Sequence, residues 1–142
     1  MSGVRRFSPD TSGGFCWADV ERLRYKEEGS APFRDITRQV LFAQPDQDCD
    51  LRYFEIAPGG FSTLERHRHT HAVLILRGRG TVRLGSSEQP VAEHDLVTID
   101  PLTWHQFHAA ADSPLGFLCL VSRQRDRPQL PTTDESAQFN RG

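Results

Sequence analysis

The sequence predicts an all-β protein, a sandwich or a barrel, folded as one domain. The chain has 142 residues, a length that suits a single domain. Its apolar residues come in short runs whose lengths suit strands better than helices. Turn-forming residues separate these runs, as they do in sandwiches and barrels, and we find no internal repeat.

The predicted strands follow the apolar runs in chain order, and turn chemistry lies between them. The last run is apolar throughout, as expected of a strand buried on both faces. A weak pattern at 19–28 also predicts a helical turn, with Val20 and Leu23 on one side. We expect strands at 36–42, 51–56, 72–76, 81–84, 96–99 and 115–121, and turns at 44–46, 58–60, 78–80, 85–87, 100–101 and 112–114.

Both ends of the chain differ from this middle part. Residues 1–14 and 123–142 are polar and rich in Ser, Gly, Pro, Gln and Arg. Such segments bury too little apolar area to offset their ordering entropy, so we expect arms or disordered tails. The predicted organisation is an N-terminal arm at 1–32, a β-barrel at 33–122 and a C-terminal tail at 123–142.

Composition argues against several classes of protein. The formal net charge is -2, so no overall positive field favours nucleic acid or an anionic membrane. The sequence has neither an apolar run of membrane-spanning length nor a signal-like N-terminus, and we expect a cytoplasmic protein. The cysteines are Cys16, Cys49 and Cys119, without a CxxC pair, so we interpret them as small buried or surface residues.

The histidines carry the strongest chemical signal. All six lie between His67 and His108, and Glu65, His67, His69 and His71 alternate immediately before an apolar run. If this tract begins a strand, the four side chains share one face. Burying three imidazoles and a carboxylate is costly unless a divalent metal ion satisfies them together.

The alternative is a solvated strand whose histidines are simply polar, or a tag-like metal binder. The sequence on both sides of the tract favours a metal site that belongs to the fold. The tract follows a Pro-Gly-Gly turn, precedes four consecutive aliphatic residues and ends at a Gly-x-Gly turn, none of which a solvent-facing tag needs. On the opposite face, Arg66 and Arg68 are expected to meet solvent or an interface, and His105 is expected to join the site from another strand.

These residues resemble the cupin family of small metal-binding jelly-roll barrels. The first cupin motif is Gly, five residues, His-x-His, three or four residues, Glu, six residues, Gly; the second contains Gly, Pro-x-Gly, His and Asn. The resemblance covers roughly residues 33–121. It implies a single RmlC-like jelly-roll barrel, or double-stranded β-helix, with polar arms at both ends.

The first motif can be aligned with this sequence in two registers. If His67 and His69 were its His-x-His, the Glu position would fall on Val73 or Leu74, which cannot bind a metal ion. Counting back from Gly78 instead aligns His71 with the motif's Glu. The same count aligns His67 and Glu65 with its two histidines, so that a carboxylate and an imidazole have exchanged places.

In the second motif, His105 aligns with the metal-binding His. The resemblance therefore implies the metal ligands Glu65, His67, His71 and His105. His69 is left over as a fifth or alternative ligand, a hydrogen-bond partner of the ligands, or a pocket acid/base. This motif departs from the family at His94, Asp100, Leu102 and Ala109, where the family has Gly, Pro, Gly and Asn.

Other candidates lie around these motifs. Tyr53 and Glu55 alternate on a predicted strand and would line the barrel as weak candidates for acid/base catalysis. Trp104 and Phe107 flank His105 and are expected to pack in the core or at its rim. His94 and His108 are expected to lie outside the site.

The resemblance implies a small cupin that binds one divalent transition metal ion, Fe, Mn, Ni, Cu or Zn, as Lewis acid or redox centre. We expect an enzyme acting on a small oxygen-bearing molecule as a dioxygenase, isomerase or lyase. A noncatalytic module that binds or senses small molecules is the alternative, although no helix-turn-helix pattern supports a regulator. Small cupins commonly pair, so we also expect a homodimer.

Overall fold

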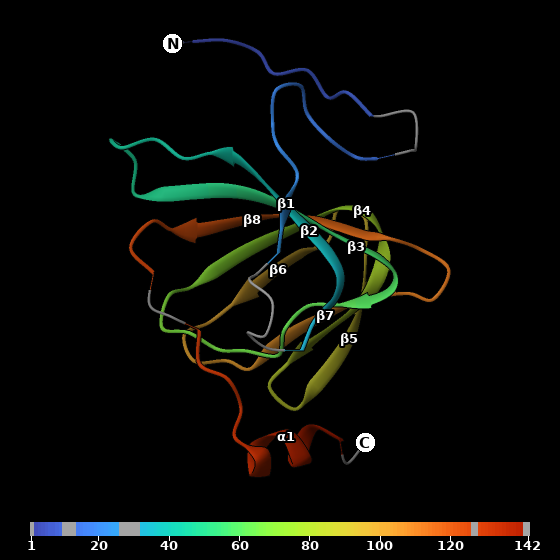
Figure 1. The fold of residues 1–142 in the computed structure, drawn as a ribbon. Helices are drawn as coiled ribbons and strands as arrows, with labels where there is room; N and C mark the ends of the chain where they lie inside the picture. Colours follow the sequence, from blue (N-terminus) through green and yellow to red (C-terminus); the bar gives the residue numbers. More distant parts are fainter. Residues whose placement is uncertain (1, 10–13, 26–31, 126–127, 141–142) are drawn as a thin grey trace.

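The computed structural model describes residues 2–9, 14–25, 32–125 and 128–140. Within them the chain forms eight strands and one short helix, which confirms the all-β prediction (Figure 1). The elements are β1 (Leu23–Arg24), β2 (Arg34–Phe42), β3 (Cys49–Phe61), β4 (His71–Leu84), β5 (Ser87–Ala92), β6 (Leu96–Ile99), β7 (His105–Ala109), β8 (Leu115–Ser122) and α1 (Thr133–Asn140).

Four antiparallel strands close the barrel. β8 pairs with β3 on one side and with β4 on the other. β7 pairs with β4 and reaches β3 through the pair Phe61 and His108. The ring β3-β8-β4-β7 is therefore closed, with β1 and β2 added beside β3 and with β5 and β6 added beside β4. This is the predicted jelly-roll barrel, and it removes the exposed edges that an open sheet of these strands would have.

Two predicted turns lie inside strands. The Gly78-Arg79-Gly80 segment belongs to β4, which joins the predicted strands 72–76 and 81–84, and Pro58-Gly59-Gly60 belongs to β3. A bulge between Ile75 and Arg77 lets β4 bend without ending. Gly78 has φ 72°, and a Cβ there would overlap the carbonyl of Pro114, so its role is to let backbone approach backbone.

The predicted helical turn at 19–28 is wrong over its described part, residues 19–25. Leu23 and Arg24 form β1, paired with Arg38 and Thr37 of β2. Pairing with the edge of an existing sheet outweighs a weak helical pattern, because the sheet offers hydrogen bonds that a single helical turn leaves unmade. The rest of that prediction, 26–28, lies outside the described residues.

The segments before and after the barrel pack against it, and in Figure 1 the two chain ends lie at opposite ends of the barrel. In the N-terminal segment, Phe15 stacks on Tyr53 of β3 with ring centroids 5.3 Å apart. In the C-terminal segment, α1 begins with a capping box. The Thr132 amide donates to the Glu135 carboxylate and the Glu135 amide donates to the Thr132 hydroxyl. Phe139 of this helix then packs under the Arg83 guanidinium at 5.1 Å.

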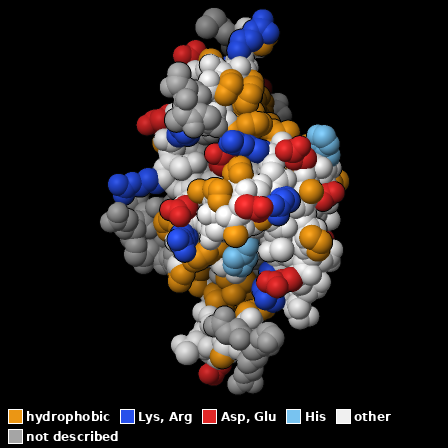
Figure 2. Space-filling view, turned by 90° about the vertical axis from the view of Figure 1, so that its right-hand side faces the viewer, with side chains coloured by type: hydrophobic (Ala, Val, Ile, Leu, Met, Phe, Trp, Pro, Cys, Tyr) orange, Lys and Arg blue, Asp and Glu red, His pale blue; other side chains and the backbone are white. Residues whose placement is uncertain are grey.

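The inner faces of the strands form one apolar core. On the outside, the face shown in Figure 2 carries basic and acidic side chains interspersed, without a patch of one sign. Among the helical residues that the structure describes, no stretch is long and apolar enough to cross a membrane. The largest buried apolar side chains of the core include Ile56, Ile75, Ile99, Leu115, Val73, Val82 and Val121.

Gly78 and Gly85 provide a matched pair of substitutions. Both have positive φ, 72° and 63°, but a Cβ at Gly85 would meet open space. We expect Gly85→Ala to lower the free energy of unfolding by about 1 kcal/mol, the cost of a left-handed residue. Gly78→Ala should cost about 3 kcal/mol, because the overlap with Pro114 adds to it. Urea unfolding measures both, and equal losses would contradict the close-approach explanation.

Candidate metal centre

The segment between β3 and β4 brings the predicted site residues to the mouth of the barrel. It is not the regular strand that the alternation predicted, since β4 begins only at His71. Instead, Glu65 and His105 exchange two backbone hydrogen bonds, of 3.2 and 3.0 Å, in an isolated bridge. This bridge ties the segment to β7 and holds both side chains in the buried part of the barrel.

The five predicted ligands come together. The His67 ring lies 3.8 Å from the His69 ring, 4.0 Å from that of His71 and 4.8 Å from that of His105, measured between centroids. Two sets of ligand atoms, each lying within 4.8 Å of one another, share His67: one adds His69 and His71, the other adds Glu65 and His105. His67 is 2% exposed and stands at the centre of the cluster.

Hydrogen bonds fix which nitrogen of two imidazoles faces the cluster. His67 Nδ1 lies 3.0 Å from the carbonyl oxygen of His69, and His105 Nδ1 lies 2.9 Å from that of Thr103. Because a carbonyl only accepts, each Nδ1 carries the proton and donates it. Each Nε2 then keeps its lone pair for a metal ion, which is the usual arrangement behind a metal-binding histidine.

The spacing of the other two imidazoles also fits one ion. His69 Nε2 and His71 Nε2 lie 2.8 Å apart. Two nitrogens bound at right angles to one ion, each at about 2.1 Å, would be separated by about 3 Å. The mixed imidazole and carboxylate donors of this His-rich group therefore suit a divalent transition metal ion.

His71 is held in the neutral form that metal binding requires. Burial, together with the neighbouring His67, His105 and His69, lowers its pKa to about 2. A neutral imidazole offers its lone pair without first losing a proton.

A cavity of about 210 Å³ opens beside the cluster. Strand alternation decides which residues of β3 reach it: Arg52 and Phe54 face inward. Of the residues around the cavity, Arg52, Arg125, Cys119 and Tyr25 were not predicted as part of the site. Its lining comprises Tyr25, Arg52, Phe54, Ser62, Thr63, Glu65, His67, His69, His71, Val73, His105, Phe107, Phe117, Cys119, Arg125 and Pro128.

Tyr53 and Glu55, predicted to line the barrel, lie on the opposite face of β3. The Tyr53 hydroxyl donates to Glu55 at 3.0 Å, and Arg77 pairs with Glu55 at 2.7 Å. Phe15 covers the Tyr53 ring from the N-terminal segment. The prediction placed them inside because alternation gives two faces without saying which one is buried in the barrel.

Cys119 is the thiol in the cavity. It lies opposite Arg52 in the β3-β8 pairing, and its Sγ is 3.8 Å from His71 Nδ1. Burial raises the pKa of the thiol to about 11, while Arg52 acts in the opposite direction. Nothing in its apolar strand distinguishes Cys119 in the sequence, so only the cross-strand register could have identified it.

Two of the departures in the second motif have an unusual backbone conformation. His94 has φ 77° and Leu102 has φ 62°, the left-handed conformation that glycine adopts most easily. Both stand where the family has Gly. His94 lies in the turn before β6 and His108 pairs with Thr81 and Phe61, so both lie outside the cavity lining, as expected.

The fold and site together define the class of protein, and comparison with known proteins agrees. The family model described as the cupin domain matches residues 52–121. The chain belongs to the cupin family.

Among individual relatives, one is a curated enzyme of Rhodospirillum rubrum, 1-methylthio-D-xylulose 5-phosphate methylsulfurylase. It is 56% identical over 133 residues, which span 94% of this chain and 85% of the relative. A cupin 2 conserved barrel domain protein of Rhodopseudomonas palustris has a crystal structure with TM-score 0.87 and 47% identity, covering 99% of this chain and 94% of that one. A cupin-2 domain of Rhodospirillum rubrum gives TM-score 0.84 and 54% identity, covering 94% and 89%.

The cluster predicts the metal content of variants. Protein purified without a His tag should hold about one divalent ion per chain after dialysis, measured by mass spectrometry of the metal. His67→Ala should abolish this content, because His67 belongs to both sets of ligand atoms. His94→Ala, outside the cavity, is the matched control and should retain it. Unchanged metal in the His67→Ala, His105→Ala double variant would eliminate the site.

The buried His71 also predicts an acid sensitivity of the metal-free protein. A folded pKa of about 2 lies below the ordinary histidine value of 6.5, so the folded state binds fewer protons than the unfolded state between these pH values. The contribution is present above pH 6.5 and is lost as the pH falls below it. From pH 7.5 to 5.5 the loss attributable to His71 approaches about 1.4 kcal/mol of unfolding free energy.

Urea titrations at the two pH values measure this loss. His71→Gln should reduce the pH dependence, whereas His94→Gln should leave it as in the parent. If both variants kept the parent's dependence, another group would be responsible for the acid sensitivity.

Proposed function

We propose that this protein is a metal-dependent enzyme that removes the methylthio group from a methylthio-substituted keto-sugar phosphate. The substrate class is the one named for the Rhodospirillum rubrum relative, to which the chain is 56% identical. The observation that carries the proposal is the shared cavity, in which a thiol, Cys119, lies beside a cluster of metal-binding side chains.

The chemistry of that substrate suits these residues. In 1-methylthio-D-xylulose 5-phosphate the methylthio group is attached to the carbon next to the ketone. The ion that Glu65, His67, His71 and His105 would hold, with His69 as a further donor, supplies a Lewis acid for the ketone oxygen. Breaking the carbon-sulfur bond then leaves its electron pair on a carbon whose charge the ketone can delocalise.

Cys119 is the group in the cavity that can take the sulfur. Its sulfur attacks the methylthio sulfur, as thiol sulfur attacks a disulfide in exchange reactions, while the thiol proton passes to the carbon that the methylthio group leaves. A disulfide forms between Cys119 and the methylthio group, and the carbon-sulfur bond of the substrate breaks. The released enolate carbon takes up the thiol proton, and the product is a deoxy keto-sugar phosphate.

His71 and Arg52 position this sulfur. With His71 among the residues that would hold the ion through Nε2, its Nδ1 would keep the proton and donate it toward Cys119 Sγ, 3.8 Å away. Arg52 lies opposite Cys119 and supplies a positive charge beside it. Two molecules of a small thiol then complete the cycle. The first displaces methanethiol from the disulfide, and the second releases Cys119 and leaves the oxidised small-molecule disulfide.

The proposal predicts release of methanethiol. Metal-loaded protein with 1-methylthio-D-xylulose 5-phosphate and excess small thiol should produce one methanethiol per substrate, detected by gas chromatography. Cys119→Ala should reduce the rate at least about a thousandfold, as the loss of a nucleophile does. Cys49→Ala removes an exposed thiol and should keep the parent rate.

The same assay separates this reaction from the oxygen-dependent chemistry that the sequence also predicted. An oxygen electrode in the reaction vessel should show no uptake coupled to methanethiol release. Coupled uptake would favour the dioxygenase. Saturable binding without product, in the presence of metal and thiol, would favour the noncatalytic binding module.

The homodimer and the cytoplasmic location stay predictions.

A further inference from the structure

The cavity carries positive charge on the side of Cys119 where Arg52 and Arg125 lie. Arg52 and Arg125 both line it, and they are the Arg or Lys side chains of that lining as far as the structure describes it. The mechanism uses Arg52 only as a neighbour of Cys119 and gives Arg125 no role. The phosphate of the proposed substrate is negatively charged and sits at the end of the carbon chain far from the ketone. Its binding therefore needs a positively charged group besides the metal-binding side chains.

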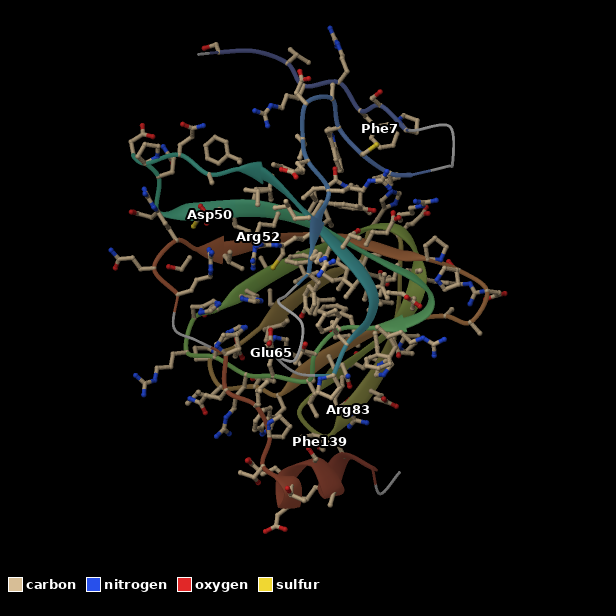
Figure 3. All side chains as sticks on the ribbon, in the orientation of Figure 1. Phe7, Asp50, Arg52, Glu65, Arg83 and Phe139 are labelled. Carbon is tan, nitrogen blue, oxygen red and sulfur yellow. The ribbon has the colours of Figure 1, made fainter. Side chains whose placement is uncertain are left out.

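β3 fixes Arg52 on the inner face. Asp50, Arg52 and Phe54 alternate along this strand and point to the same side. The Arg52 guanidinium lies over the Phe54 ring, 4.9 Å from its centroid, and opposite Cys119 in the neighbouring strand. This stacking holds the planar guanidinium in one orientation, as needed for bidentate recognition. Figure 3 shows Asp50 and Arg52 next to each other on β3, with Glu65 on a different wall.

Arg125 is held beside Arg52 by Asp50. Its Nη1 donates to the Asp50 carboxylate and to the Ser122 carbonyl oxygen, both at 2.9 Å. Because Asp50 and Arg52 are two residues apart on one face of a strand, Arg125 is brought to the Arg52 end of the cavity. The Arg125 side chain is 30% exposed, so it stands at the opening, whereas Arg52 lies deeper.

Two guanidinium groups lie close together at this end of the cavity. Burial lowers the pKa of Arg52, and the Arg125 and Arg38 guanidinium groups lower it further. Among the described residues, Asp50 pairs here with Arg125, and Glu65 is a further carboxylate of the same lining. A phosphate monoester carries close to two negative charges at neutral pH and offers oxygens that match the guanidinium fork.

We propose that Arg52 and Arg125 form the site that binds the phosphate of the substrate. This inference rests on the proposed function for its substrate class. The phosphate at the arginine end orients the sugar so that its ketone and methylthio group extend past Cys119 toward His71. The two arginines therefore determine specificity for phosphorylated over unphosphorylated sugars.

Binding of D-xylulose 5-phosphate tests this site without any turnover, because this ligand lacks the methylthio group. Calorimetry of the metal-free parent should show binding, and D-xylulose should bind at least tenfold more weakly. Arg52→Gln and Arg125→Gln should each weaken D-xylulose 5-phosphate about 10- to 100-fold, the range for a lost charge-assisted contact. Arg52→Lys should recover only part of the loss, since lysine lacks the fork.

Arg38→Gln is the matched control. Arg38 lies close enough to affect the pKa of Arg52, but it is outside the cavity lining and donates to the Arg24 carbonyl oxygen. It should change the affinity less than threefold. Circular dichroism and thermal unfolding check each fold, and Arg125→Gln keeps the test valid if the loss of stacking on Phe54 unfolds Arg52→Gln.

The outcomes separate the two proposals. Arginine-dependent binding of D-xylulose 5-phosphate without methanethiol release supports the phosphate site and rejects the proposed reaction. Methanethiol release with parent-like KM in both arginine variants supports the reaction and overturns the phosphate site. A loss in affinity equal to that of Arg38→Gln would also overturn it, because it would reflect general charge rather than contact.

Discussion

The structure depends above all on burying a group of ionisable side chains inside a small barrel. Side chains normally fill a barrel of this kind. Here imidazoles and a carboxylate occupy part of that interior, and Glu65, His67, His71 and His105 are all buried. The Glu65-His105 backbone bridge closes this end of the barrel and also brings two of these side chains together. The same backbone contact therefore holds this end of the barrel together and assembles part of the site.

The barrel wall gives the two ends of the cavity different chemistry. At one end the imidazoles present lone pairs, and hydrogen bonds from Nδ1 of His67 and His105 to carbonyls hold these lone pairs inward. At the other end the Arg52 and Arg125 guanidinium groups present donors. Cys119 lies between these ends, paired across the sheet with Arg52 and in contact with His71. The proposed Lewis acid, nucleophile and phosphate site would thus lie along one extended molecule.

Much of this could be predicted from the sequence, for identifiable reasons. Apolar runs and histidine spacing are local signals, and they gave the fold class and the five residues of the cluster. The Thr132 and Glu135 spacing of a capping box is present in the sequence, but the polar composition of the tail led us to expect no helix there. The inner face of β3 could not be predicted, because side chains alternate equally to both faces of a strand. Nothing near them in the sequence shows that Arg52 rather than Tyr53 faces the cavity. Cys119 sits in a strand without alternation, so only its cross-strand partners reveal its place.

The left-handed backbone at His94 and Leu102 bears on how such proteins are recognised. Family patterns record glycine at these positions because glycine reaches that conformation at the lowest cost. In this chain His and Leu side chains stand on the left-handed backbone, at a cost of roughly 1 kcal/mol per residue that packing elsewhere in the barrel must offset. What the fold requires there is a torsion angle, so a comparison of backbone angles would align these turns where a comparison of residue types reports mismatches.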